Sequence, residues 1–165
     1  SNMIVISIIG KSNSGKTTLI EKLIPELKKR GYKVATIKHD AHSFEVDKIG
    51  KDSWRHKNAG AEISIVSSSK KIALFFDAQE DNTLEYLCEN HIKGMDIVLT
   101  EGYRMSKYPK IEVIGSNNNK ELLCGQADNL LAIVSKQDFD CKAPVIKPDN
   151  ISGIADMIVK LKEAG

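Results

Sequence analysis

The sequence predicts an α/β fold in which helices flank a mostly parallel β-sheet, with a β-hairpin as an extension. Residues 4–9 (IVISII) form a short, apolar, β-branched run that is typical of a strand buried on both faces. A glycine-rich loop, an amphipathic segment and a second strand-like run follow in that order. Strand, loop, helix and strand together form the unit from which parallel sheets are built.

The first helix is expected over residues 16–30, where apolar residues recur at helical spacing and Gly31 stands at the position of a C-terminal cap. Pro25 lies inside this pattern and predicts a kink or a break, because proline removes a backbone donor and collides with the preceding turn. The second strand is expected over residues 34–38, with a polar loop over residues 40–50.

The middle of the chain changes in character. A short helix is expected over residues 52–59, and two β-rich runs at 62–67 and 72–76 surround a polar turn and predict a hairpin. Another short helix is expected over residues 83–91. The hairpin is strongly apolar, so its edges favour pairing with a second copy of the chain, although it could also pack on its own domain.

The last third returns to the pattern of the first. Strands are expected at residues 97–101, 110–114 and 130–134, with a turn-rich loop over 115–120 (GSNNNK). A closing helix is expected over residues 150–164. Together these elements predict a single nucleotide-binding domain over residues 3–165. Ser1 and Asn2, before Met3, are expected to be a remnant of tag cleavage.

Composition narrows the class of protein. The 165 residues are 41% hydrophobic, which is enough for a core, and the formal net charge is only +2, which predicts no binding to nucleic acid or to an anionic membrane. No apolar run reaches the roughly 18 residues of a membrane-spanning helix. The three cysteines are widely spaced and form no C-x-x-C pair, so we expect a reduced, cytoplasmic protein.

A phosphate-binding motif of the form G-x-x-x-x-G-K-[ST] lies between the first strand and the first helix, which is the context that a P-loop requires. Its glycines let backbone N–H groups approach phosphate oxygens, and the helix N-terminus adds partial positive charge. Lys16 is expected to reach the β- and γ-phosphates, and the Thr17 hydroxyl to bind Mg²⁺. The predicted nucleotide-binding residues of this motif are Gly10, Asn13, Ser14, Gly15, Lys16, Thr17 and Thr18.

Two acidic residues are candidates for the chemistry beside the phosphates. Glu101 ends the predicted strand 97–101 and is expected to act on Mg²⁺, directly or through a water, as the second acidic group of P-loop proteins does. Asp40 follows the second strand, at the edge where ligands of α/β sheets bind, and could orient a water or join the metal shell. The alternative for both is a place in a solvated surface loop.

The segment Ser135-Lys136-Gln137-Asp138 follows the strand 130–134 and approximates the [NT]-K-x-D segment of GTP-binding proteins. A carboxylate at Asp138 would accept hydrogen bonds from guanine N1–H and from the exocyclic amine. Asp138 is therefore the predicted guanine-reading residue, and the alternative is that it only caps a turn.

Beyond the P-loop, further segments resemble the family of molybdopterin-guanine dinucleotide biosynthesis protein MobB, over residues 4–114. The resemblance implies a GTP-binding accessory protein of molybdenum cofactor maturation that needs Mg²⁺, hydrolyses GTP slowly at most, and is dimeric. It implies a molybdopterin guanylyltransferase and molybdoenzymes as partners. The segments that carry it are Ile37-Lys38-His39-Asp40, Asp47-Lys48-Ile49-Gly50-Lys51-Asp52-Ser53, Ala59-Gly60-Ala61 and Leu99-Thr100-Glu101-Gly102-Tyr103.

Two other functions are compatible with a P-loop. A small-molecule kinase usually carries arginines in a lid, and only Arg30, Arg55 and Arg104 are present, which disfavours fast phosphoryl transfer. A metal-delivery GTPase is disfavoured because the chain has no histidine-rich or C-x-x-C segment.

Overall fold

The structure is a computed structural model that describes residues 2–40, 51–79, 83–116, 122 and 129–165. The chain folds into two compact units, one formed by residues 1–39 with 88–165 and the other by residues 40–87. Residues 41–50 and 117–120, which belong to two of the predicted loops, lie outside the described residues.

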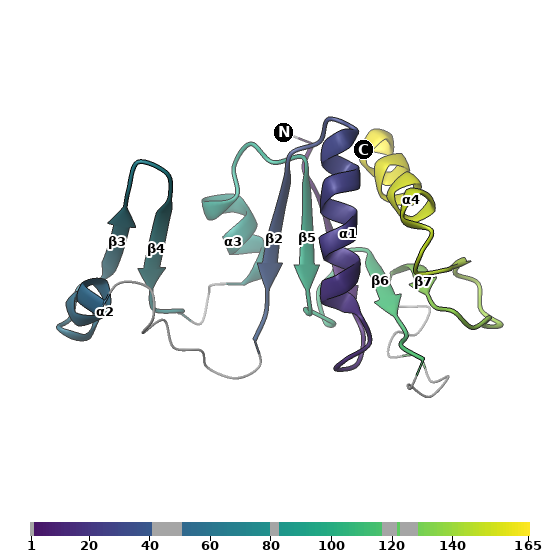
Figure 1. Cartoon of the computed structure of the whole chain (residues 1–165), viewed down its shortest axis with the longest axis horizontal. Helices are drawn as coiled ribbons and strands as arrows, with labels where there is room; N and C mark the ends of the chain where they lie inside the picture. Colours follow the sequence, from purple (N-terminus) through teal and green to yellow (C-terminus); the bar gives the residue numbers. More distant parts are fainter. Residues whose placement is uncertain (1, 41–50, 80–82, 117–121, 123–128) are drawn as a thin grey trace. The chain divides into compact units, whose positions relative to one another are not determined.

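The first unit is built on six parallel strands in the order β2-β5-β1-β6-β7-β8. Since all of them are parallel, their carboxyl ends meet at one edge of the sheet. β1 lies between β5 and β6, so the loop that follows it emerges at the middle of that edge (Figure 1). The strands are β1 (Ile4–Ile9), β2 (Val34–Lys38), β5 (Ile97–Glu101), β6 (Lys110–Val113), β7 (Leu130–Val134) and β8 (Val145–Ile146).

Two helices, α1 (Lys16–Lys29) and α4 (Ile151–Ala164), lie side by side over one face of the sheet (Figure 1). Their buried residues, among them Leu23, Leu27 and Ile158, join the alternate strand residues in one core. Asn150 caps α4, because its side-chain oxygen accepts a hydrogen bond from the Gly153 N–H at 3.0 Å. Arg30, at the C-terminal end of α1, donates to Asp156 of α4 at 2.6 Å.

The sequence predicted a kink or a break at Pro25, and the break is wrong, because α1 runs from Lys16 to Lys29 with Pro25 inside it. Proline leaves the carbonyl of Glu21, four residues earlier, without its helical donor. Both Glu21 and Pro25 are exposed, so water can satisfy that carbonyl. The buried face of α1 on the sheet supplies the packing that holds the helix together through this position.

The second unit contains α2 (Lys51–Asn58) and the predicted hairpin, formed by β3 (Ile63–Ser67) and β4 (Ile72–Phe76). One face of this hairpin is apolar and open to solvent: Ile65 is 60% exposed and Ile72 is 74% exposed. Ile63 and Leu74 belong to the same exposed group. α3 (Leu84–His91) begins in this unit and ends in the first.

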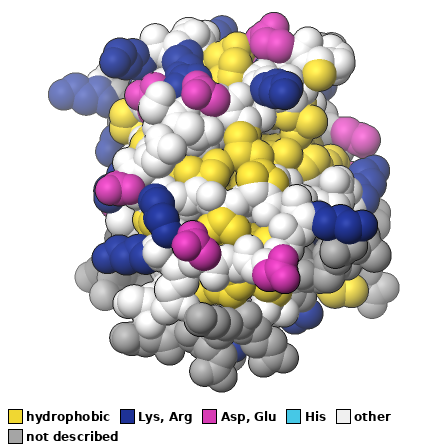
Figure 2. All heavy atoms as spheres, turned by 90° about the vertical axis from the view of Figure 1, so that its right-hand side faces the viewer, with side chains coloured by type: hydrophobic (Ala, Val, Ile, Leu, Met, Phe, Trp, Pro, Cys, Tyr) yellow, Lys and Arg dark blue, Asp and Glu magenta, His cyan; other side chains and the backbone are white. Residues whose placement is uncertain are grey.

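Figure 2 shows the side on which α4 and β7 lie in Figure 1. Hydrophobic side chains gather in its middle, and basic and acidic side chains are interspersed around them, so neither sign of charge forms a continuous patch on this face. None of the described helices is long and apolar enough to cross a membrane. The predicted fold, a mostly parallel α/β sheet with a hairpin extension, is confirmed.

Candidate functional site

The loop between β1 and α1 takes backbone conformations that favour glycine. Gly15, at the N-cap of α1, has a φ of 104°, and Gly10 has a φ of 155°. A Cβ atom at Gly10 would lie 2.5 Å from the carbonyl oxygen of Val113, which is closer than real Cβ contacts come. The glycines of the motif are thus needed for the turn itself, and the turn leaves the N-terminus of α1 open to a ligand.

Lys16 reaches back along the loop. Its Nζ donates to the carbonyl oxygen of Gly10 at 2.6 Å and to that of Lys11 at 3.3 Å. These two bonds hold the ammonium group beside the loop backbone, so its positive charge is in place before any anion arrives. A cation held in this way loses less conformational entropy on binding phosphate than a free side chain does.

Glu101 and Thr17 meet at the mouth of the loop. The Thr17 hydroxyl donates to Glu101 Oε1 at 2.8 Å. The two residues are 84 positions apart in sequence and are brought together because β5 pairs with β1, with Glu101 opposite Ile8. The contact lies at a cavity of about 510 Å³ whose walls include most of the predicted set: Asn13, Ser14, Gly15, Lys16, Thr17, Thr18 and Glu101.

The residues at this contact fit Mg²⁺. A hydroxyl oxygen and a carboxylate oxygen are the kind of ligand that this ion prefers. Among the described residues, no group of three or more His, Cys, Asp or Glu side chains could hold a metal by itself. An ion at Thr17 and Glu101 would therefore take its remaining ligands from water and phosphate, as Mg²⁺ at nucleotide sites does.

The backbone around Glu101 is tightly fixed, which the sequence did not indicate. The Glu101 carbonyl accepts from the His39 N–H at 3.0 Å, and the Gly102 N–H donates to the carbonyl of Ile8 at 3.0 Å. Tyr103 follows with a φ of 62°, unusual for an aromatic residue, and its ring packs on that of His39 at 4.9 Å between centroids. Burial raises the pKa of the Tyr103 hydroxyl above its usual value.

A largely buried network of polar side chains joins the end of β5 to the segment 102–108. The Thr100 hydroxyl donates to Ser7 Oγ at 3.1 Å, and Ser7 Oγ lies 3.0 Å from Ser106 Oγ. Lys110, almost fully buried, donates to the carbonyl oxygens of Ser106 and Tyr108. Residues 102–108, which follow Glu101, are therefore hydrogen-bonded to β1 through Ser7 and to β6 through Lys110.

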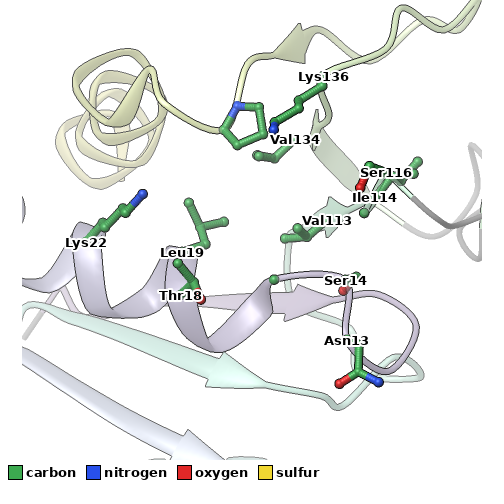
Figure 3. Close-up of a pocket in the computed structure, with 13 residues that line it drawn as sticks. Asn13, Ser14, Thr18, Leu19, Lys22, Val113, Ile114, Ser116, Val134 and Lys136 are labelled. Carbon is green, nitrogen blue, oxygen red and sulfur yellow. The ribbon is translucent and has the colours of Figure 1, made fainter.

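A second cavity of about 250 Å³ adjoins the first, and Figure 3 shows its lining. It lies between the start of α1 and the ends of β6 and β7 and shares Asn13, Ser14, Gly15 and Thr18 with the phosphate-loop cavity. Lys22 and Lys136 also line it, and neither was predicted as a site residue. The sequence carried a signal for both residues. Lys22 follows Thr18 by one helical turn, and Lys136 belongs to the segment 135–138 in which only Asp138 was predicted to bind the nucleotide.

Asp138 and Asp40 are not among the lining residues of the two cavities. The Asp138 side chain is 96% exposed, pairs with Lys147 Nζ at 3.3 Å, and does not line either cavity. Guanine reading by Asp138 stays a prediction. Asp40 is exposed and belongs to the second unit, so its predicted catalytic role also stays a prediction. Residues 47–50, which carry part of the family resemblance, lie outside the described residues.

A parallel sheet with a glycine loop after its central strand, and an acidic residue at the end of the neighbouring strand, defines the P-loop NTPase fold. Within this class, the chain belongs to the family of molybdopterin guanine dinucleotide synthesis protein B, MobB, whose family model matches residues 5–136.

Relatives extend the match over most of the chain. It is 36% identical to the molybdopterin-guanine dinucleotide biosynthesis adapter protein of Haemophilus influenzae over 156 residues, which cover 93% of this chain and 86% of the relative. Identity to the adapter protein of Escherichia coli is 32% over 154 residues, covering 90% and 87%. A crystal structure of molybdopterin-guanine biosynthesis protein B has a TM-score of 0.80 at 30% identity, covering 97% of this chain and 99% of that one.

Proposed function

We propose that this protein binds GTP with Mg²⁺ at the P-loop and serves as an accessory protein in molybdopterin-guanine dinucleotide biosynthesis. The observation that carries the nucleotide part is the 2.8 Å hydrogen bond between Thr17 and Glu101 at the cavity beside Lys16. A hydroxyl, a carboxylate and a held ammonium group at a helix N-terminus are the groups that a Mg²⁺-triphosphate requires. The pathway part rests on the family and on relatives named as adapter proteins.

The roles of the residues follow from their chemistry. Backbone N–H groups of the loop and of the first turn of α1 donate to phosphate oxygens, and the Lys16 ammonium neutralises charge on the β- and γ-phosphates. Thr17 and Glu101 hold Mg²⁺ at the phosphates. When bound, the ion supplies charge neutralisation and orients the phosphate chain.

We expect GTP hydrolysis to be slow or to depend on a partner. Among the described residues that line the phosphate cavity, none is an arginine, glutamine or histidine. Groups of that kind orient the attacking water or stabilise the charge of the transition state. The isolated protein should therefore release phosphate from GTP far below the roughly 1–100 s⁻¹ of kinases. Rapid release by the purified protein, followed by a phosphate assay, would contradict this expectation.

The partners follow from the role of an adapter. We propose a molybdopterin guanylyltransferase as the main partner, molybdoenzymes as further partners, and the cytoplasm as the location of the protein. It also takes the protein as a homodimer. The support is the exposed apolar face of the β3–β4 hairpin, in which Ile63, Ile65, Ile72 and Leu74 are all at least 43% exposed.

Calorimetric titration tests the nucleotide part of the proposal. GTP should bind more tightly with Mg²⁺ than without it, and more tightly than ATP. Equal or tighter binding of ATP, together with phosphorylation of a small molecule, would favour the kinase alternative. If neither nucleotide binds, the proposal is wrong.

A further inference from the structure

The turn that follows β5 has an unusual backbone. Gly102 and Tyr103 both take left-handed conformations, with φ of 97° and 62°. A tyrosine rarely does so, because its Cβ atom comes too close to the following carbonyl oxygen, and such a conformation persists only where surrounding contacts hold it. The turn directly follows Glu101, the last residue of β5 and the acidic residue of the phosphate site. Backbone strain of this kind is concentrated at functional sites, so its place beside Glu101 points to a role there.

His39 supplies contacts that hold this turn. It follows β2, which pairs with β5 and lies beside it in Figure 1. The His39 N–H donates to the carbonyl oxygen of Glu101 at 3.0 Å, and the His39 ring packs on the Tyr103 ring with 4.9 Å between centroids and 45° between planes. A Cβ atom at Gly102 would lie 3.4 Å from the His39 Cβ atom. His39 therefore contacts the turn through its backbone and through its side chain, and all four residues belong to the first unit.

The same turn is fixed from the strand on the other side. β1 pairs with β5, with Ile8 opposite Glu101, and the Gly102 N–H donates to the carbonyl oxygen of Ile8 at 3.0 Å. Ile8 is fully buried, so the core sets its position. The main chain at the end of β5 is thus hydrogen-bonded to the residue after β2 and to β1, and it has little freedom to shift.

The function of Glu101 depends on this backbone. Its Oε1 atom accepts from the Thr17 hydroxyl at 2.8 Å, and the proposed Mg²⁺ would be held at this contact. A glutamate side chain has several rotatable bonds and loses much conformational freedom when it is held in one place. A metal ligand is effective only when it stays within about 0.5 Å of the required position. A fixed main chain at Glu101 reduces the number of places that its carboxylate can reach.

We propose that Tyr103 and His39 are positioning residues of the metal site: the contact between their rings holds the turn at 102–103 and thereby directs the Glu101 carboxylate to Thr17 and Mg²⁺. This inference rests on the proposed function, since it concerns the ion that is bound with the phosphates. Neither ring lines the phosphate cavity, so both residues act through Glu101 and do not touch the nucleotide. The proposal explains why an aromatic residue occupies a conformation that glycine adopts more readily.

Titration of the intact protein with inorganic triphosphate, with and without Mg²⁺, tests this role without any contribution from a base. The measured quantity is the factor by which Mg²⁺ tightens binding. In the Tyr103→Ala protein this factor should fall roughly tenfold, at the lower end of the range for residues that orient a metal ligand. Binding without Mg²⁺ should not weaken, because the P-loop is untouched. Tyr103→Phe keeps the ring and should retain the wild-type factor.

His39→Ala removes the other ring and keeps the backbone N–H that donates to Glu101. If the two rings act as a pair, this variant should lose the same factor, and the double variant should lose no more than either single variant. Tyr32→Ala is the matched control. It removes a half-buried tyrosine that precedes β2, at the end of the sheet opposite the phosphate loop, and should lower the melting temperature without altering the effect of Mg²⁺.

An unchanged effect of Mg²⁺ in the Tyr103→Ala protein would overturn the inference, and the proposed function would stand. An equal loss in the Tyr103→Ala and Tyr103→Phe proteins would also overturn it, since the hydroxyl and not the ring would be responsible. Binding that weakens equally with and without Mg²⁺ would show that the turn only maintains the fold. If circular dichroism shows that Tyr103→Ala is unfolded, His39→Ala decides by the same criteria. If Mg²⁺ does not tighten binding to the wild-type protein, the proposed metal site is wrong and the inference with it.

Discussion

Lys16 is the side chain whose loss bears most directly on the phosphate site. In the structure its ammonium is held by the carbonyl oxygens of Gly10 and Lys11, at 2.6 Å and 3.3 Å. Lys16→Ala removes this charge and leaves the glycine backbone of the loop in place. The change therefore separates the contribution of the cation from that of the N–H groups.

The expected magnitude has two parts. Removing a cation that pairs with phosphate costs roughly 2–4 kcal/mol of binding, the range for losing one partner of a hydrogen-bonded charge pair. At about 1.4 kcal/mol per tenfold change, this corresponds to a loss of affinity of roughly 30- to 700-fold. Stability should fall far less, because each of the two backbone hydrogen bonds contributes only about 1 kcal/mol. Affinity and stability thus move by different amounts.

Calorimetry with GTP and with inorganic triphosphate measures the loss of affinity, and thermal unfolding measures the loss of stability. Lys28→Ala serves as the control, since it removes an exposed lysine from the last turn of the same helix. It should change neither GTP affinity nor stability appreciably. Unchanged affinity in the Lys16→Ala protein would refute the reasoning, because the nucleotide would then bind somewhere other than the P-loop.

Three further substitutions test the metal site, the phosphate loop and the β3–β4 hairpin. Glu101→Gln should reduce the Mg²⁺-dependent part of GTP affinity by roughly 10- to 100-fold. It should not weaken binding without Mg²⁺, because a carboxylate that repels the phosphates is neutralised, and titration at several Mg²⁺ concentrations checks both expectations. Gly10→Ala places a Cβ atom 2.5 Å from the Val113 oxygen, so thermal unfolding should show a loss of about 1–3 kcal/mol, and an unchanged melting temperature would disprove the steric argument. Ile65→Glu with Leu74→Lys replaces a cross-strand apolar pair by opposite charges, which keeps the hairpin paired and should convert a dimer into a monomer by light scattering.

The fold was predictable because its signals are local. β1, β5 and β7 stand out as largely apolar runs, whereas β6 carries Lys110 and Glu112 between its apolar residues. Local patterns leave the order of the strands in the sheet open. The break expected at Pro25 does not occur, because the cost of a proline inside a helix depends on whether water can reach the carbonyl that loses its helical donor, here that of Glu21. That depends on which way the helix faces, which is a property of the packed molecule.

The phosphate loop was predictable for a different reason: its residues are contiguous, so the local sequence alone determines the conformation of the loop. Glu101 was found because strand ends in a parallel sheet converge, although only the structure shows that its partner is Thr17. The second cavity was not found, since it is assembled from α1, β6 and the segments after β6 and β7. Similarly, a four-residue match at Asp138 says nothing about the direction in which its carboxylate points.

The hydrogen bonds of Arg30 affect how the phosphate site can respond to a ligand. Arg30 donates to Glu26 of its own helix, and to the side chain of Asp156 and the carbonyl oxygen of Ser152 in α4. These hydrogen bonds hold the C-terminal end of α1 against α4, and the buried face of α1 packs on the sheet. These contacts oppose a rigid-body movement of α1 when phosphate binds at its N-terminal end. The N-terminal end of α1 adjoins the glycine loop, so we expect any adjustment to a bound phosphate to be confined to the backbone of residues 10–15.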